Sequence, residues 1–129
     1  MSKYTFGKTV SLDPAAAVQK VTEALSKEGF GVLTEIDVSG TMKKKLNLDL
    51  PPYRILGACN PQLASKAIAA EPEIGALLPC NVVVRQDAQG ATRVEFMDPA
   101  AVLQLVDRPE VSTLAAEVRS RLERVMAAL

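Results

Sequence analysis

The 129-residue chain carries 15 Lys and Arg residues against 15 Asp and Glu residues, so its formal charge is zero, and 48% of its residues are hydrophobic. This length suits one compact domain with a buried core, which we assign to residues 1–129. The charge balance argues against non-specific nucleic-acid binding, which needs a cationic face. The sequence has no histidine, which removes the usual general base and the commonest metal ligand.

The sequence also argues against a membrane or secreted protein. No segment approaches the ~20 apolar residues of a membrane span, and residues 1–6 do not resemble a signal peptide. The only two cysteines, Cys59 and Cys80, do not make a disulfide framework in a chain of this length. We therefore expect a soluble, cytoplasmic protein with reduced thiols and with neither nucleic acid nor membrane as a partner.

The first third of the chain predicts strand, helix, strand and a short helix. Residues 4–10 have the composition of a strand. Asp13-Pro14 opens a helix, because Asp caps free backbone N–H groups and Pro fits the first helical position; Gly29 ends that helix. Residues 30–38 alternate with the period of two that is typical of a half-buried strand. A short helix over residues 41–46 follows.

The middle of the chain predicts a third strand over residues 53–59 and a helix that opens at Asn60-Pro61. Apolar residues recur in this helix at helical spacing and are expected to form its buried stripe. Residues 74–79 form a compact turn or short helix. The buried stripe of the helix that opens at Asn60-Pro61 consists of Leu63, Ala64, Ala67 and Ile68.

Two strands and two helices complete the prediction. Residues 81–86 and 92–97 are strands joined by a hairpin connection at residues 87–90. Asp98-Pro99 opens a short helix, and apolar residues three and four apart predict a long amphipathic helix over residues 111–129.

This order of elements predicts an α+β protein, β-α-β-(α)-β-(α)-β-β-(α)-α, with a mainly antiparallel sheet and helices packed on one face. With these elements assigned, the chain resembles the bacterial and archaeal family called domain of unknown function 302 over nearly its whole length. Three stretches and the Asp98-Pro99 pair carry the resemblance: residues 28–37, residues 53–61 and residues 77–84. The resemblance implies an arrangement similar to the TATA-binding-protein-like fold, and it brings no established activity.

The two cysteines are the most distinctive chemical groups. Cys59 ends a strand where Asn60 opens a helix, and Cys80, followed by Asn81, begins the next strand. If these strands are antiparallel neighbours, both sulfurs lie at the same edge of the sheet, beside the positive end of a helix. Such a pair suits a thiolate, a reversible disulfide or a two-coordinate soft cation such as Cu(I). The alternative is structural, since free cysteines are commonly buried as small hydrophobic residues and Asn before Pro is a helix cap.

Charged residues on the strands form a second candidate surface. Paired carboxylates serve acid/base chemistry in a cleft, whereas alternating charges on a strand more often form a solvated, ion-paired face. If the charged faces of the strands coincide opposite the helices, that open face also carries apolar side chains and becomes a candidate homodimer surface. The charged residues are Glu35, Asp37, Arg54, Arg93 and Glu95, and the apolar ones are Leu33, Leu56 and Met97.

Three functions follow as hypotheses. The first is a non-enzymatic binding module that holds a small molecule or soft metal ion near Cys59, Asn60, Cys80 and Asn81; the sequence identifies no cofactor and assigns no catalytic residue in this case. The second is a thiol-based redox protein or enzyme with Cys59 as nucleophile and Cys80 as the resolving thiol. The third is a structural protein that forms a homodimer.

Overall fold

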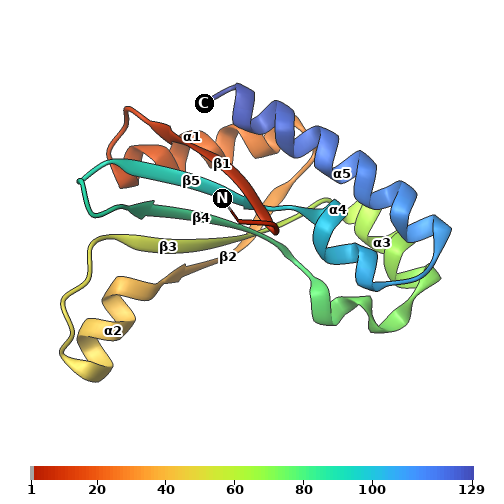
Figure 1. Ribbon diagram of the computed structural model, residues 1–129, viewed down its shortest axis with the longest axis horizontal. Coiled ribbons are helices and arrows are strands. Elements are labelled where there is room, and N and C mark those ends of the chain that lie inside the picture. The colour runs from red at the N-terminus through yellow and green to blue at the C-terminus, as the bar shows by residue number, and fades with distance from the viewer. Residues whose placement is uncertain (1) are drawn as a thin grey trace.

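The computed structural model describes residues 2–129 and confirms the α+β class. A five-stranded sheet occupies one part of the molecule; the two longest helices lie on one of its faces, a group of short helices lies beyond one end, and another short helix lies at the opposite end (Figure 1). In chain order the elements are β1 (Thr5–Val10), α1 (Pro14–Lys27), β2 (Gly31–Asp37), α2 (Val38–Leu46), β3 (Tyr53–Cys59), α3 (Pro61–Ala70), the 3-10 helix η1 (Pro72–Leu77), β4 (Cys80–Gln86), β5 (Thr92–Met97), α4 (Pro99–Val102), the 3-10 helix η2 (Leu103–Leu105) and α5 (Pro109–Ala127).

The sheet has the strand order β1-β5-β4-β3-β2, and every neighbouring pair is antiparallel. The pairing of β3 with β4 aligns Ala58 with Cys80, so the end of β3 and the start of β4 lie at the same end of the sheet, which meets the condition of the cysteine hypothesis. The edge strand β2 has a register shift between Val32 and Thr34, which leaves Leu33 as an extra residue.

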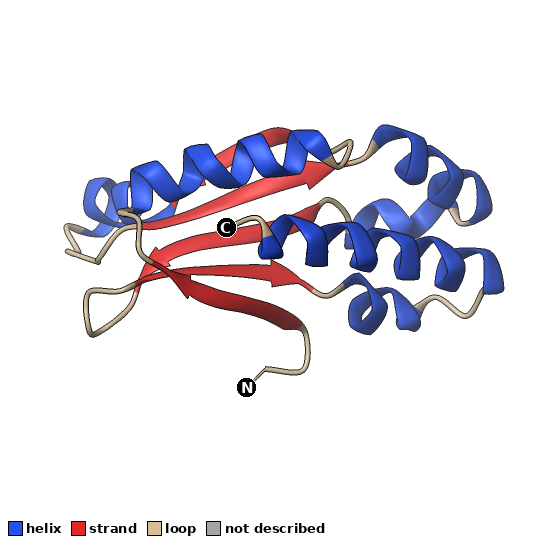
Figure 2. Cartoon of the chain, turned by 90° about the horizontal axis from the view of Figure 1, so that it is seen from above, coloured by secondary structure: helices blue, strands red, loops and turns tan. Residues whose placement is uncertain are grey.

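Two clusters of buried side chains hold the helices in place. The first lies between the sheet, α1 and the C-terminal half of α5, and it includes Phe96 and Leu122. The second joins α3, η1 and η2 to the N-terminal half of α5 and includes Ile74 and Val111. Helix α5 contributes to both clusters, and Figure 2 shows it running from the group of short helices back over the sheet.

Three of the predicted helix starts are confirmed by their caps. The side chains of Asp13, Asn60 and Asp98 accept hydrogen bonds from backbone N–H groups of the following turn at 2.8, 3.2 and 3.0 Å. Each satisfies a donor that the helix itself leaves free. Helix α2 begins earlier than predicted, at Val38, because Asp37 caps it by accepting from Gly40 N at 3.0 Å.

The expected single charged face was wrong for two reasons. The regular register of β3 places Arg54 and Leu56 on the buried face of the sheet, and the bulge in β2 moves the carboxylate side chains that follow it to that same face. One extra residue reverses the side to which all later side chains of a strand point. Glu35 therefore pairs with Leu56, which is fully buried under the helices, whereas Glu95 pairs with Val83 on the opposite face. Leu56 is thus a core residue and not part of an exposed dimer surface.

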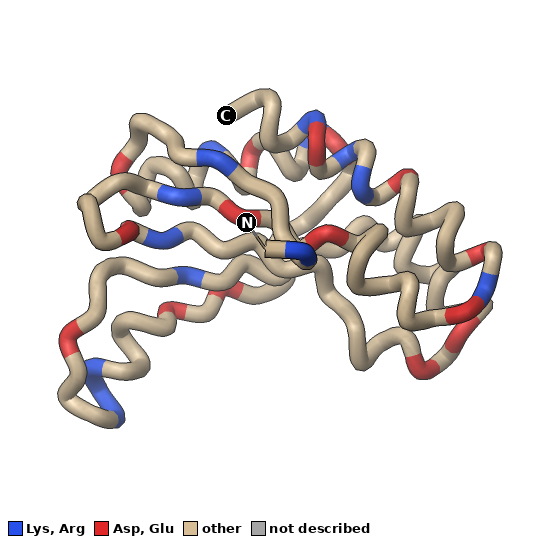
Figure 3. Tube along the Cα trace, viewed as in Figure 1, with Lys and Arg blue, Asp and Glu red and all other residues tan. Residues whose placement is uncertain are grey.

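The charges nevertheless form ion pairs, as expected for a solvated face. Arg54 Nη1 lies 2.9 Å from Glu35 Oε2, and Arg85 Nε lies 2.6 Å from Glu95 Oε1. Figure 3 shows positive and negative residues interspersed over strands and helices. Across residues 2–129, no helix is long and apolar enough to cross a membrane.

Candidate functional site

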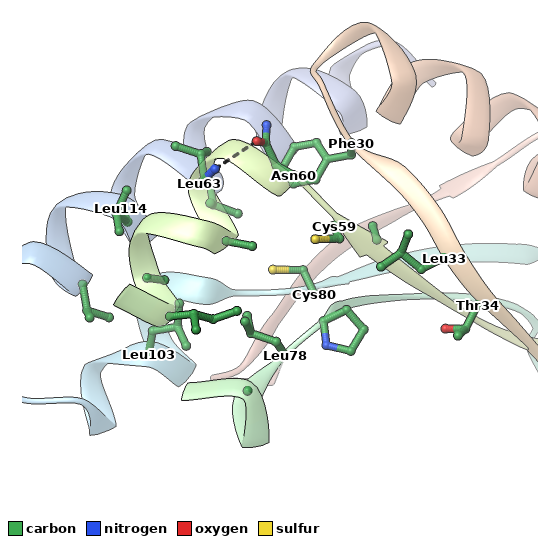
Figure 4. A pocket seen from close by; sticks show the side chains of 18 residues that line it. Phe30, Leu33, Thr34, Cys59, Asn60, Leu63, Leu78, Cys80, Leu103 and Leu114 are labelled. Carbon is green, nitrogen blue, oxygen red and sulfur yellow. Dashed lines mark hydrogen bonds between the residues drawn. The ribbon is translucent and has the colours of Figure 1, made fainter. Parts of the chain in front are cut away.

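A cavity of about 370 Å³ lies at the end of the sheet where β3 ends and β4 begins. Its walls come from β2, β3, α3, η1, β4, η2 and α5, so both core clusters border it (Figure 4). The volume lies within the ~300–1,000 Å³ typical of small-molecule sites. It is also about two and a half times the 150 Å³ of an engineered apolar cavity that binds benzene.

Small residues keep this space open. Ala58, Ala64 and Ala67 line it from β3 and α3, and Gly75 lines it from η1. A Cβ atom added at Gly75 would meet nothing within 4 Å. Because larger side chains at these positions would extend into the space between the two clusters, the alanine-rich helix α3 accounts for much of the cavity.

The predicted buried stripe of α3 is the cavity wall. Only Ala67 of that stripe is buried, and Ile68 is 46% exposed. Leu63 and Ala64 are half-buried, and all four residues line the cavity. The helical periodicity was therefore correct, but the stripe faces a space and not only packed neighbours.

Helix α5 forms the wall opposite the sheet end and is fixed by polar contacts. The Arg121 side chain donates to the backbone oxygen of Glu28 at 3.0 Å, and Arg124 Nη2 lies 2.9 Å from the Glu28 carboxylate. These contacts tie α5 to the segment that follows α1. They position Val118 and Leu114, the residues of α5 that line the cavity nearest the middle of the helix.

The lining of the cavity is uncharged. Its polar side-chain groups are the thiols of Cys59 and Cys80, the hydroxyl of Thr34 and the amide of Asn60, and its other members are apolar or glycine. Figure 4 shows both sulfurs reaching the same space from neighbouring strands. An uncharged lining gives no counter-charge to an ion, so desolvation disfavours a charged ligand there.

The two thiols differ in their surroundings. Both are free, with Cys59 half-buried and Cys80 only 7% exposed. Burial, and secondarily the neighbouring Cys59, raises the pKa of Cys80 from its ordinary value of 9.0 to about 11. Cys80 is therefore a protonated thiol at neutral pH.

The two asparagines predicted for the site lie in different environments, one in the cavity wall and one outside the cavity lining. The Asn60 oxygen accepts from Leu63 N, and Figure 4 shows the amide nitrogen pointing away from the sulfurs, so this side chain serves as a helix cap at the cavity wall. Asn81 is exposed and lies opposite Gly57 in the sheet, outside the cavity lining. Of the four residues predicted for the site, the structure thus brings Cys59, Asn60 and Cys80 together.

Comparison with known proteins agrees with the fold. A family model described as "Domain of unknown function DUF302" matches residues 6–129. The chain belongs to this family. A crystal structure of an uncharacterized conserved DUF302 protein from Bacillus stearothermophilus superimposes with a TM-score of 0.91 at 29% sequence identity, covering 98% of each chain. A search of curated proteins gives no match. The likeness to the TATA-binding-protein-like fold stays a prediction.

The sequence indicated the thiols but not the apolar walls. Leu103, Val111 and Leu114 line the cavity from segments that lie far from the cysteines in the chain. Their apolar spacing is the same as that of ordinary core residues. The run of small residues in α3 was the one local signal, because a helix packed tightly against a core usually carries larger side chains there. Among residues 2–129, no three His, Cys, Asp or Glu side chains gather as a metal-binding group.

Proposed function

We propose that this DUF302 domain is a binding module for a small, neutral and largely apolar molecule. The observation that carries the proposal is the cavity of about 370 Å³ with an uncharged, mainly apolar lining. Apolar walls with a few polar groups are characteristic of small-molecule sites, in which the apolar surface supplies affinity and the polar groups fix orientation. Here the thiols of Cys59 and Cys80 and the hydroxyl of Thr34 are those polar groups.

A small neutral molecule fits these observations better than a soft metal ion. Two thiolates with Cu(I) would carry one net negative charge, and no cationic side chain lines the cavity. Ionising Cys80 at pH 7 against a pKa of about 11 would cost about 5 kcal/mol before a metal gained any bond. The same cost does not apply to a neutral ligand, since it leaves both thiols protonated.

The test uses N-phenyl-1-naphthylamine, a neutral apolar dye that fluoresces strongly when it leaves water. We expect the reduced protein to bind it with one site per chain. Ala64→Leu adds three carbons inside the cavity and should weaken binding about tenfold or more, the equivalent of about two methylene groups of ligand burial. Ala69→Leu makes the same change at an exposed position of the same helix and should leave binding unchanged.

The proposal fails if the dye does not bind the parent protein, or if both leucine variants bind it as the parent does. In the second case the dye would occupy a surface site, because Ala64 lines the cavity and Ala69 does not.

A further inference from the structure

The positions of Cys59 and Cys80 permit a bond between their sulfurs. Ala58 pairs with Cys80, so Cys59 is offset from Cys80 by one residue across neighbouring antiparallel strands. A strand spacing near 5 Å and a rise near 3.4 Å place the two Cα atoms about 6 Å apart, within the ~4.4–6.8 Å that disulfides span. In a regular strand such residues point to opposite faces, but Cys59 is the last residue of β3, and Figure 4 shows both sulfurs in the same space.

The same cavity gives the two thiols unequal access. Cys59 is half-buried, whereas Cys80 is almost completely buried. Two residues of the cavity lining are both apolar and exposed, Leu33 at 67% and Ile68 at 46% exposure. Helix α3 starts at Pro61, so the positive end of its dipole lies close to Cys59. A reagent that approaches from solvent therefore reaches Cys59 more readily than Cys80.

We infer that Cys59 and Cys80 form a redox site that reduces neutral, apolar hydroperoxides. The inference rests on the proposed function for the binding of the apolar body of the substrate, and it adds the class of substrate and a reaction. The uncharged walls hold the hydrocarbon part, and the hydroperoxyl end reaches the sulfur of Cys59.

The oxidation of the two thiols to a disulfide needs no component beyond the hydroperoxide. The Cys59 sulfur attacks the terminal oxygen of the hydroperoxide; the O–O bond breaks, and the thiol proton passes to the departing oxygen, giving an alcohol and a sulfenic acid on Cys59. The Cys80 sulfur then attacks the Cys59 sulfur, and the S–O bond breaks as the S–S bond forms. Because the Cys80 thiol is protonated at neutral pH, its proton passes to the departing hydroxyl in this same step, and water leaves. Two electrons pass from the thiols to the hydroperoxide, and a thiol reductant returns the disulfide to the dithiol by exchange.

The uncharged cavity accommodates a disulfide at a lower desolvation cost than a charged metal complex. The disulfide is neutral, so the uncharged lining imposes no desolvation cost on it. Cys80 suits the resolving role because it is only 7% exposed, so an oxidant from solution reaches it less readily than it reaches the half-buried Cys59.

The experiment treats the reduced full chain with cumene hydroperoxide or with hydrogen peroxide at equal concentration. Free thiols are counted over time, and intact mass identifies the product. We expect one intramolecular disulfide per chain, formed about tenfold or more faster with cumene hydroperoxide, because binding in the cavity positions the reacting atoms. Cys80→Ser should stop at a sulfenic acid on Cys59 that dimedone traps. Cys59→Ser should leave Cys80 a free thiol.

The leucine pair separates this inference from the binding proposal. Ala64→Leu should lower the ratio of the cumene hydroperoxide rate to the hydrogen peroxide rate about fivefold or more, whereas Ala69→Leu, which lies outside the cavity lining, should leave both rates unchanged. Dye binding without disulfide formation would leave the binding module and overturn the redox site. Disulfide formation at equal rates with both peroxides, without dye binding, would overturn the binding module and the substrate class together. Unchanged thiols, or disulfides between chains, would also overturn the redox site.

Discussion

Filling the cavity should stabilise the protein while it removes binding. Ala64→Leu places three additional carbons in space that the lining leaves empty. At about 0.8 kcal/mol per buried methylene these are worth at most about 2.4 kcal/mol. Ordering a leucine side chain costs about 0.5–1 kcal/mol. The free energy of unfolding should therefore rise by about 1.5 kcal/mol, or about 5 °C in Tm for a chain of this size.

The measurement is chemical denaturation followed by far-ultraviolet circular dichroism, which suits a chain without tryptophan. Ala69→Leu is the matched control, because residue 69 is exposed on the same helix, and its effect should stay within about 0.5 kcal/mol. If the two core clusters closed up against each other and left no space, the added carbons would overpack them at a cost of about 1–3 kcal/mol. A destabilised Ala64→Leu beside a neutral Ala69→Leu would refute the reasoning.

Three further predictions concern stability. Gly75→Ala should raise the free energy of unfolding, measured by chemical denaturation, by about 0.4–1 kcal/mol, because its Cβ meets open space. Gly29→Ala should lower it by more than that, because φ is +84° and the Cβ would lie 2.9 Å from Asn60 Nδ2. A stabilised Gly29→Ala beside a destabilised Gly75→Ala would contradict the backbone geometry. Asn60→Ala should lower the free energy of unfolding by about 1 kcal/mol because α3 loses its cap, and Asn60→Ser should recover most of this loss. Equal stability of Asn60→Ala and Asn60→Ser would show that the cap contributes nothing. Folding raises the pKa of Cys80, so its contribution to the free energy of unfolding is complete below pH 9 and is lost as the pH rises toward 11. Over that range the free energy of unfolding of the parent should fall by about 3 kcal/mol relative to that of Cys80→Ala. Parallel stability curves of the parent and Cys80→Ala over that range would exclude the raised pKa.

Local chemistry explains which parts of the fold were predictable. The starts of α1, α3 and α4 depend on a capping side chain and a following proline, both visible in adjacent residues. The strand over residues 53–59 has the predicted bounds. The antiparallel pairing of β3 with β4, on which the meeting of the two thiols depends, was a condition of the hypothesis, because a helix between two strands is also compatible with parallel pairing.

Features that depend on distant segments were not predictable in the same way. A bulge leaves no clear mark on a period-two pattern, so the face of Glu35 could not be assigned from the sequence, and the face of Arg54 depends on the register of β3 against β4. The cavity depends on where α5 crosses between two clusters, and its residues have the spacing of any amphipathic helix. Whether the sheet or another surface makes a homodimer stays a prediction.

The bulge at Leu33 has a consequence for solubility. A regular edge strand offers its unpaired backbone groups to any other extended chain, and irregular edges oppose such intermolecular growth. The extra residue that breaks the regular edge of β2 also lines the cavity. Deleting it would give a smoother, more aggregation-prone edge and remove a side chain from the cavity lining at once, so protection from fibrous self-assembly and the shape of the cavity depend on the same single residue.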